Sequence, residues 1–208
     1  QMDEHDVVKT SHTLTNIKAG TYHVNRLANT LPLPARANEL MTYYGRWVHE
    51  FQTVRQPLTQ GGYQQENRRG RTSHEHYPAL VVGTTHFDEM NGDVWGFHFA
   101  WSGNHRLRAD VKADGRRYMQ AEVIYLPGEV ALEEGESVTT PWLYASFSNA
   151  GLNGMSHHFH SHVRDSILPR NFSVKPRPIH LNTWEGIYFD HDPQYIISMA
   201  SQAAEMGV

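Results

Sequence analysis

Cysteine is absent from the 208-residue sequence, which excludes disulfide bonds, thiol catalysis and cysteine-ligated zinc. No apolar run approaches the ~18 residues that a membrane-spanning helix needs, so we expect no membrane partner. Neither sign of charge is in large excess, since 18 Lys and Arg against 22 Asp and Glu give a formal charge of −4. A mildly acidic chain has no general field that attracts polyanions, so we also expect no nucleic acid partner.

The first residues lack a charged segment followed by an apolar one, so no secretory signal is visible. Such a signal is removed from a mature protein, and cysteine-free proteins occur in reducing and oxidising compartments alike. The compartment therefore stays open, with the cytoplasm favoured.

Apolar residues make up 39% of the chain and aromatic residues 11%, which is enough for a packed core. From about residue 43 to residue 149, short apolar alternations predict antiparallel strands, at about residues 45–54, 77–84, 94–101, 130–132 and 139–147. The clearest hairpin joins residues 106–113 to residues 116–126 through Asp114-Gly115, which suits a two-residue turn with positive φ. The pattern indicates a large antiparallel sandwich.

One helix is predicted over residues 153–168, with Pro169 ending it and apolar side chains at fourfold spacing, namely Met155, Phe159, Val163 and Ile167. This helix carries a histidine cluster, namely His157, His158, His160 and His162. His158 and His162 lie four residues apart and adjoin the apolar stripe, so they either present two imidazoles to a metal or rim the core and meet solvent. Two ligands do not make a site, and the structural interpretation is favoured.

The loop at residues 60–73 is the most polar segment, and its arginines are followed by a short ionisable stretch, in all Arg68, Arg69, Arg71, His74, Glu75 and His76. One interpretation is a patch for phosphate or nucleic acid. The acidic net charge and the sparse aromatics favour a solvated or inter-subunit surface with local carboxylate partners. A serine nucleophile is disfavoured because no G-x-S-x-G elbow surrounds the candidates, Ser146, Ser148, Ser156 and Ser161.

A second helix is predicted over residues 194–206, beginning after Asp192-Pro193 and stopping at Gly207. Residues 177–184, just before it, are interpreted as a short strand. A strand followed by a helix is the unit of parallel α/β sheets, and a parallel strand needs neighbours. We therefore expect residues 171–208 to open a larger α/β domain that this chain does not contain.

A polar and aromatic group stands at and beyond the end of this expected strand, namely Trp184, Glu185, Asp190, His191 and Asp192. The carboxyl ends of parallel strands are where ligand-binding residues collect. An exposed tryptophan offers a sugar ring an apolar platform. The alternative, that Trp184 caps the core and Asp192 is only a helix cap, stays open.

Several segments together resemble glycoside hydrolase family 36, the microbial α-galactosidases and their relatives. They follow the family's order along the chain, at residues 45–50, 68–74, 101–104, 151–156 with Phe159-His160, and 177–185. The resemblance implies a mainly β fold: an antiparallel β-supersandwich with one or two helices, followed by a (β/α)8 barrel. Residues 1–170 would be the later part of the supersandwich and residues 171–208 the first strand and helix of the barrel.

The resemblance implies a retaining enzyme that hydrolyses terminal α-linked galactose from oligosaccharides. Retention needs two carboxyl groups, a nucleophile and an acid, about 5–5.5 Å apart. In the family these are aspartates on later barrel strands, and this sequence contains neither the Lys-Trp-Asp motif of the nucleophile nor the family's Asp-Asp pair. The chain alone is therefore expected to be inactive, with no catalytic residue of its own, no metal and no cofactor.

The resemblance implies a substrate-binding role for two residues of this chain. Trp184 matches the family's first-strand tryptophan that lines the galactose pocket, and Asn182 is a weaker candidate on the same face. Thr183 and Gly186 stand where Asn and Ala are commoner in the family, which leaves the fine substrate preference open. The resemblance also implies a homo-oligomer. Alternatives are a non-catalytic sandwich module that binds carbohydrate or assembles subunits, a transglycosylase that builds raffinose-type sugars, or an enzyme for N-acetylgalactosamine.

Overall fold

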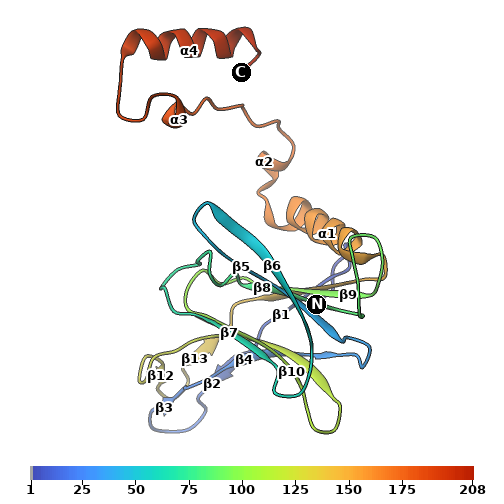
Figure 1. Cartoon of the computed structure of the whole chain (residues 1–208). Coiled ribbons are helices and arrows are strands. Elements are labelled where there is room, and N and C mark those ends of the chain that lie inside the picture. Colours follow the sequence, from blue (N-terminus) through green and yellow to red (C-terminus); the bar gives the residue numbers. More distant parts are fainter. Residues whose placement is uncertain (1) are drawn as a thin grey trace. The chain divides into compact units, whose positions relative to one another are not determined.

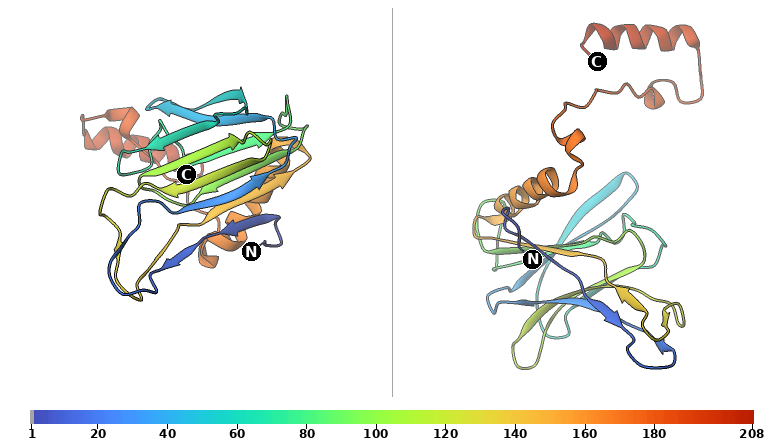
Figure 2. Two further views of the ribbon diagram at one scale, coloured as in Figure 1. Left: turned by 90° about the horizontal axis from the view of Figure 1, so that it is seen from below. Right: turned by 180° about the vertical axis from the view of Figure 1, so that it is seen from behind.

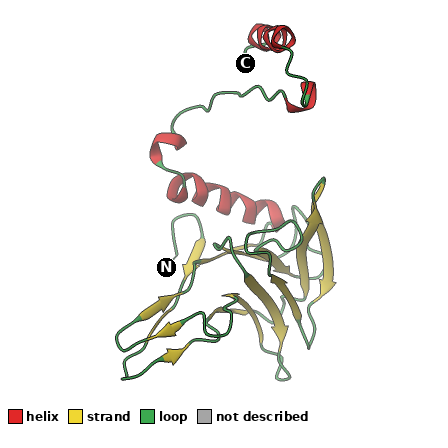
Figure 3. Cartoon of the chain, turned by 90° about the vertical axis from the view of Figure 1, so that its left-hand side faces the viewer, coloured by secondary structure: helices red, strands yellow, loops and turns green. Residues whose placement is uncertain are grey.

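The computed structural model describes residues 2–208, and for Phe172 and Ser173 the backbone alone. The chain divides into two compact units, Gln1–Val163 and Arg164–Val208. In the described backbone, the strands lie in the first unit and the second consists of helices and loops (Figures 1 and 3).

Two antiparallel sheets form the body of the first unit (Figure 2). The six-stranded sheet has the order β1 (Val7–Thr10), β14 (Leu143–Ser148), β9 (Val94–Phe99), β8 (Ala79–Gly83), β5 (Glu39–Arg46) and β6 (His49–Pro57). The four-stranded sheet has the order β4 (Ala28–Leu33), β11 (Arg117–Val123), β10 (His105–Val111) and β7 (Tyr63–Asn67). Two short pairs complete the unit: β3 (Tyr22–His23) with β12 (Ala131–Leu132), and β2 (Thr13–Thr15) with β13 (Ser137–Thr139).

The main core lies between the two sheets, and period-two alternation explains which side chains fill it. Leu40, Leu80 and Val82 of the larger sheet are buried in one cluster with Leu107 and Met119 of the smaller sheet. A sandwich of two antiparallel sheets was predicted from the alternating pattern, and this is confirmed.

A second apolar cluster lies on the other face of the six-stranded sheet. Met41, Val81 and Val94 alternate with the main-core residues and pack with Met155 of helix α1 (Gly151–His162). Strand β8 in the middle of this sheet is thus buried on both faces, which explains its continuous apolar run, Ala79–Gly83.

Helix α1 confirms only the first part of the predicted helix. Met155 is buried and Phe159 packs on the second cluster. The remaining stretch, Val163–Ile167, is a π-helix in which Val163 and Ile167 are exposed. The expected fourfold stripe fails there because a π-helix turn contains more residues than an α-helix turn.

The predicted hairpin is confirmed as β10 and β11, but its two-residue turn is wrong. The Gly115 N–H donates to Lys112 O at 2.9 Å and the Lys112 N–H to Arg116 O at 2.8 Å. Of the Asp-Gly pair, only Gly115 has positive φ, at 84°. These bonds describe a type I turn closed by one left-handed residue, the usual three-residue hairpin loop.

Other strands were placed imperfectly. The expected strand at residues 45–54 spans the turn of a hairpin, because Trp47 and Val48 connect β5 to β6 and Arg46 pairs with His49. The polar loop at residues 60–73 contains β7. Strands β1 to β4 were not predicted at all.

The second unit contains α2 (Arg170–Ser173), α3 (Trp184–Ile187) and α4 (Pro193–Glu205). The α4 helix was predicted, and it is capped as expected: Asp192 Oδ1 accepts from the Gln194 N–H at 2.9 Å, and Gly207 follows with φ of 92°. The strand expected at residues 177–184 is not formed in this structure. No strand in residues 2–208 pairs with it, and a strand needs a neighbour to satisfy its backbone groups.

No helix in the described part of the chain is long and apolar enough to cross a membrane.

Candidate functional site

Trp184, the leading candidate for substrate binding, is the first residue of α3. The Asn182 side chain is directed back to the chain, since its Oδ1 accepts from the Trp184 N–H at 2.9 Å. Asn182 therefore positions the start of α3. The Trp184 side chain is 47% exposed, so it does not cap a core in the described structure.

Two further aromatic rings surround Trp184. The Tyr188 ring lies edge-on at 5.5 Å between centroids, and the Phe189 ring lies edge-on at 5.1 Å. Tyr188 has a positive φ of 46°, and its N–H donates to Trp184 O at 2.8 Å, so the chain turns sharply after α3. Together these three residues form the α3 aromatic cluster.

The α3 aromatic cluster is exposed as well as mutually packed, since 84% of Phe189 remains accessible. Exposed aromatic faces bind the apolar C–H faces of sugar rings, and edge-on packing keeps such rings rigid. The sequence identified Trp184 but missed Tyr188 and Phe189. The available signal was their spacing, four and five residues after the tryptophan.

Glycine at position 186 lets α3 approach α4 closely. A Cβ placed on Gly186 would lie 2.8 Å from Met199 Cε. The clash involves only the end of a flexible side chain, so an alanine fits after a small movement of Met199.

The acidic groups near Trp184 do not form a catalytic pair. Asp192 is occupied as the cap of α4, as the simpler interpretation proposed. The Asp190 N–H donates to Ile187 O at 2.8 Å within the turn. Glu185, Asp190 and His191 are all exposed.

The histidines of α1 divide into two pairs. His157 and His160 are exposed, whereas His158 and His162 contact residues of the first unit. The expectation that His162 meets solvent is wrong, because it is only 5% exposed and its Nδ1 contacts Asp3 Oδ2. Among the described residues, no group of three or more His, Asp or Glu side chains is arranged to hold a metal ion.

Ser146 and His158 are neighbours but do not form a nucleophile with its base. Ser146 Oγ lies 2.9 Å from His158 Nδ1 and donates to the Asp6 carbonyl at 3.0 Å. Since the hydroxyl proton goes to that carbonyl, the imidazole acts as donor, and the pair fixes α1 to β14.

Two of the three arginines of the polar loop, Arg68 and Arg69, have local carboxylate partners, as predicted. Arg69 pairs with Glu75 at 2.6 Å and Arg68 with Glu66 at 2.7 Å. These exposed pairs neutralise the patch locally.

Family comparisons cover nearly the whole chain. Residues 1–133 match the glycosyl hydrolase family 36 N-terminal domain, and residues 137–208 match the melibiase family. An alpha-galactosidase of Escherichia coli is 55% identical over 202 residues, which cover 97% of this chain and 28% of that protein. Alpha-galactosidase AgaA of Geobacillus stearothermophilus is 32% identical over 182 residues, covering 88% of this chain and 25% of that protein.

Solved structures agree with the fold. The crystal structure of the GH36 alpha-galactosidase AgaA from Geobacillus stearothermophilus matches with a TM-score of 0.85 at 30% identity, covering 98% of this chain and 28% of that one. The galactosidase domain of the alpha-galactosidase-sucrose kinase AgaSK matches with a TM-score of 0.87 at 26% identity, covering 99% and 29%. The chain thus spans under a third of the length of these relatives. Because the match to the family's N-terminal domain covers more than half of this chain, the chain belongs to glycosyl hydrolase family 36.

Proposed function

We propose that this chain is part of a retaining α-galactosidase, a glycoside hydrolase that releases terminal α-linked galactose from oligosaccharides. The observation that carries the proposal is the 55% identity to an alpha-galactosidase over 97% of the chain. The exposed α3 aromatic cluster supports it, since such a cluster suits a sugar ring.

In this proposal the chain supplies a scaffold and one wall of the galactose pocket. Residues 1–170 are the later part of a β-supersandwich, and residues 171–208 begin the catalytic (β/α)8 barrel. Trp184 stacks on the apolar face of galactose, and Asn182 holds its backbone in place. Two carboxyl groups about 5–5.5 Å apart, supplied by other parts of the longer protein, perform the displacement and protonate the leaving oxygen.

The longer protein acts as a homo-oligomer in the cytoplasm and needs no metal or other cofactor. Its reaction is hydrolysis, although a raffinose-type transglycosylase would use the same pocket wall.

The proposal is tested by assaying an aryl α-galactoside with the longer protein and with the 208-residue chain. We expect hydrolysis by the longer protein only. Hydrolysis by the chain alone would contradict its scaffold role, and a longer protein inert on α-galactosides would contradict the substrate.

The role of Trp184 is tested in the same assay. We expect Trp184→Ala to raise KM about tenfold, since aromatic contacts contribute roughly 0.5–1.5 kcal/mol beyond buried area, and Trp184→Phe to raise it less. Trp142→Ala, at a half-exposed tryptophan of the first unit, is the matched control. An unchanged KM in Trp184→Ala would remove this residue from the pocket.

A further inference from the structure

Three of the segments that carried the family resemblance meet at one place in the first unit. Residues 45–50 form the turn from β5 to β6, and residues 68–74 and 101–104 are loops. The Gly70 N–H donates to Asn104 Oδ1 at 2.8 Å, which joins the two loops. Glu50 and Phe51 line a hollow with residues 72–74, which brings in the hairpin.

The hairpin of β5 and β6 needs a glycine at its turn to bring the Glu50 carboxylate to the hollow. A Cβ on Gly45 would lie 2.4 Å from His49 O, so only glycine lets β5 and β6 close at this point. Val48 and Phe51 have positive φ, at 63° and 52°, which bends the hairpin further. The strained turn fixes Glu50 beside Phe51.

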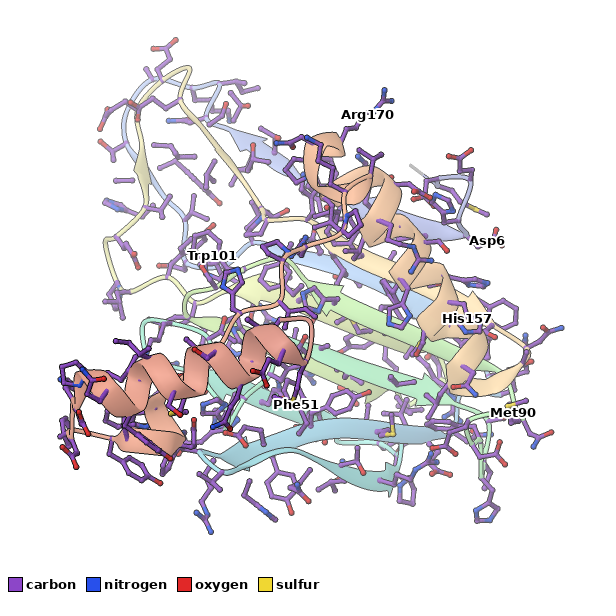
Figure 4. All side chains as sticks on the ribbon, turned by 90° about the horizontal axis from the view of Figure 1, so that it is seen from above. Asp6, Phe51, Met90, Trp101, His157 and Arg170 are labelled. Atoms are coloured by element: carbon purple, nitrogen blue, oxygen red, sulfur yellow. The ribbon has the colours of Figure 1, made fainter. Side chains whose placement is uncertain are left out.

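The hollow has a volume of about 220 Å³ and an aromatic floor. The Tyr77 ring is edge-on to Phe51 at 5.0 Å and to Tyr43 at 6.1 Å. Phe51 is 60% exposed, so one ring face remains open. Tyr43 also packs on the apolar cluster under α1, which places the hollow on the α1 side of the six-stranded sheet, the side viewed in Figure 4, where Phe51 is labelled.

Two tyrosine hydroxyls and one carboxylate are the polar groups of the hollow that concern a ligand. The hydroxyls of Tyr43 and Tyr77, both half-buried, make no hydrogen bond with any residue from 2 to 208. Each hydroxyl can therefore both donate to and accept from a ligand in the hollow. Glu50 Oε1 accepts from the Val48 N–H at 2.9 Å, and this bond holds the pKa of Glu50 below its usual value, so its carboxylate is an ionised acceptor.

We propose that this hollow binds one neutral sugar ring, with Phe51 against the apolar C–H face and with Glu50, Tyr43 and Tyr77 hydrogen-bonded to sugar hydroxyls. The choice of a sugar rests on the proposed function. The ligand is neutral because the carboxylate disfavours an anion. It is a single ring because pockets for larger ligands measure roughly 300–1,000 Å³.

The test is saturation-transfer NMR of galactose and melibiose with the 208-residue chain and its variants. We expect Phe51→Ala and Tyr77→Phe each to weaken binding about tenfold, the first by removing the platform and the second by removing only a hydroxyl. Tyr22→Phe, at an exposed tyrosine of β3, is the matched control. Trp184→Ala separates this site from the α3 aromatic cluster, and we expect it to leave binding at the hollow unchanged.

Two results would overturn the proposal. One is sugar binding by the Trp184→Ala chain that persists when Phe51→Ala or Tyr77→Phe is added, with circular dichroism unchanged. The other is the absence of any sugar binding to the chain. Neither result bears on aryl α-galactoside hydrolysis by the longer protein, so the failure of this site and the failure of the proposed function are distinguishable.

Discussion

His105 is a fully buried histidine at the start of β10. Its Nδ1 lies 3.1 Å from Gly103 O, and its Nε2 has no hydrogen-bond partner among the described residues. Burial lowers the pKa of His105, outweighing the Gly103 hydrogen bond that opposes it. Burial and the nearby His105 also lower the pKa of His98. Both imidazoles are therefore held neutral by the fold.

This burial predicts loss of stability in mild acid. A depressed histidine pKa contributes stability that is complete above about pH 6.5, the unfolded value, and is lost as the pH falls through the folded pKa. We expect the urea midpoint of denaturation to be lower at pH 5 than at pH 7.5. In His105→Asn, which keeps a donor for Gly103 O, this decrease in the midpoint should be smaller. The check is urea denaturation at both pH values.

The matched control for this experiment is His157→Asn, at an exposed histidine of α1. It should show the pH dependence of the unaltered chain. A His105→Asn variant with that same dependence would contradict the assignment to His105.

Single residues also mark the limit of prediction at the candidate site. The Asp192 cap was predicted from a local pattern, Asp-Pro before a helix, whereas Trp184 became a candidate through the family resemblance and its place after an expected strand. The packing of Tyr188 and Phe189 on Trp184 was not predicted. It depends on the positive φ of Tyr188, which no conformational preference of tyrosine indicates.

At the scale of elements, α1 is seated on the six-stranded sheet at Gly96 of β9. A Cβ on Gly96 would lie 2.1 Å from Met155 Sδ and 3.1 Å from its Cγ. The Met155 side chain of α1 therefore occupies the space that a side chain at position 96 would fill.

This close contact predicts that substitutions at Gly96 and Met155 have non-additive effects on the free energy of unfolding. We expect Gly96→Val to lower the free energy of unfolding by about 1–3 kcal/mol through overpacking, and Met155→Ala to lower it by about 2–4 kcal/mol through a cavity. The double variant should lose less than the sum, because the new side chain occupies the space of the methionine. Urea denaturation of all four proteins checks this, and strict additivity would contradict the contact.

Strands were harder to predict than helices for a physical reason. The hairpin of β10 and β11 is local, and its alternation was sufficient. Strand β1 pairs with β14 and β4 with β11, partners far along the chain, and Pro32 in β4 argued against a strand. The strand expected at residues 177–184 is not formed here for a related reason, since a strand pattern does not reveal whether a neighbouring strand is present.

At the scale of the whole first unit, one contact joins its two ends. Asp3 Oδ2 contacts His162 Nδ1, and Asp3 Oδ1 accepts from the N–H groups of His5 at 3.0 Å and Val7 at 2.9 Å. Burial alone would raise the pKa of Asp3, but the hydrogen bonds from Val7, His162 and His5 outweigh it and lower the pKa.

This contact predicts a second loss of stability in stronger acid. A depressed aspartate pKa gives stability that is present above about pH 3.9 and lost as the pH falls through the folded value. We expect Asp3→Asn to cost about 1 kcal/mol at pH 7 and to speed hydrogen exchange of the β1 amides. Asp114→Asn, at an exposed turn, is the control. Unchanged exchange in Asp3→Asn would show that the contact does not hold β1.

The general architecture was accessible from the sequence, whereas its assembly was not. Alternating strands predicted a sandwich, and the resemblance supplied the family. Neither indicated that the turn from β5 to β6 and the loop at residues 72–74 would enclose an aromatic hollow, because Phe51 and Tyr77 meet through pairing of β5 with both β6 and β8.

The pairing of β1 with β14 also governs when the protein is able to fold during synthesis. Val7 pairs with Ser146, and β2 and β3 likewise wait for β13 and β12. At about 5–20 residues per second, a ribosome needs on the order of ten seconds between the first strand and its partner. Throughout that interval the nascent β1 has no sheet to join and the outer edge of β9 stays bare. Chaperone capture in the cell should therefore be concentrated on nascent chains shorter than the end of β14.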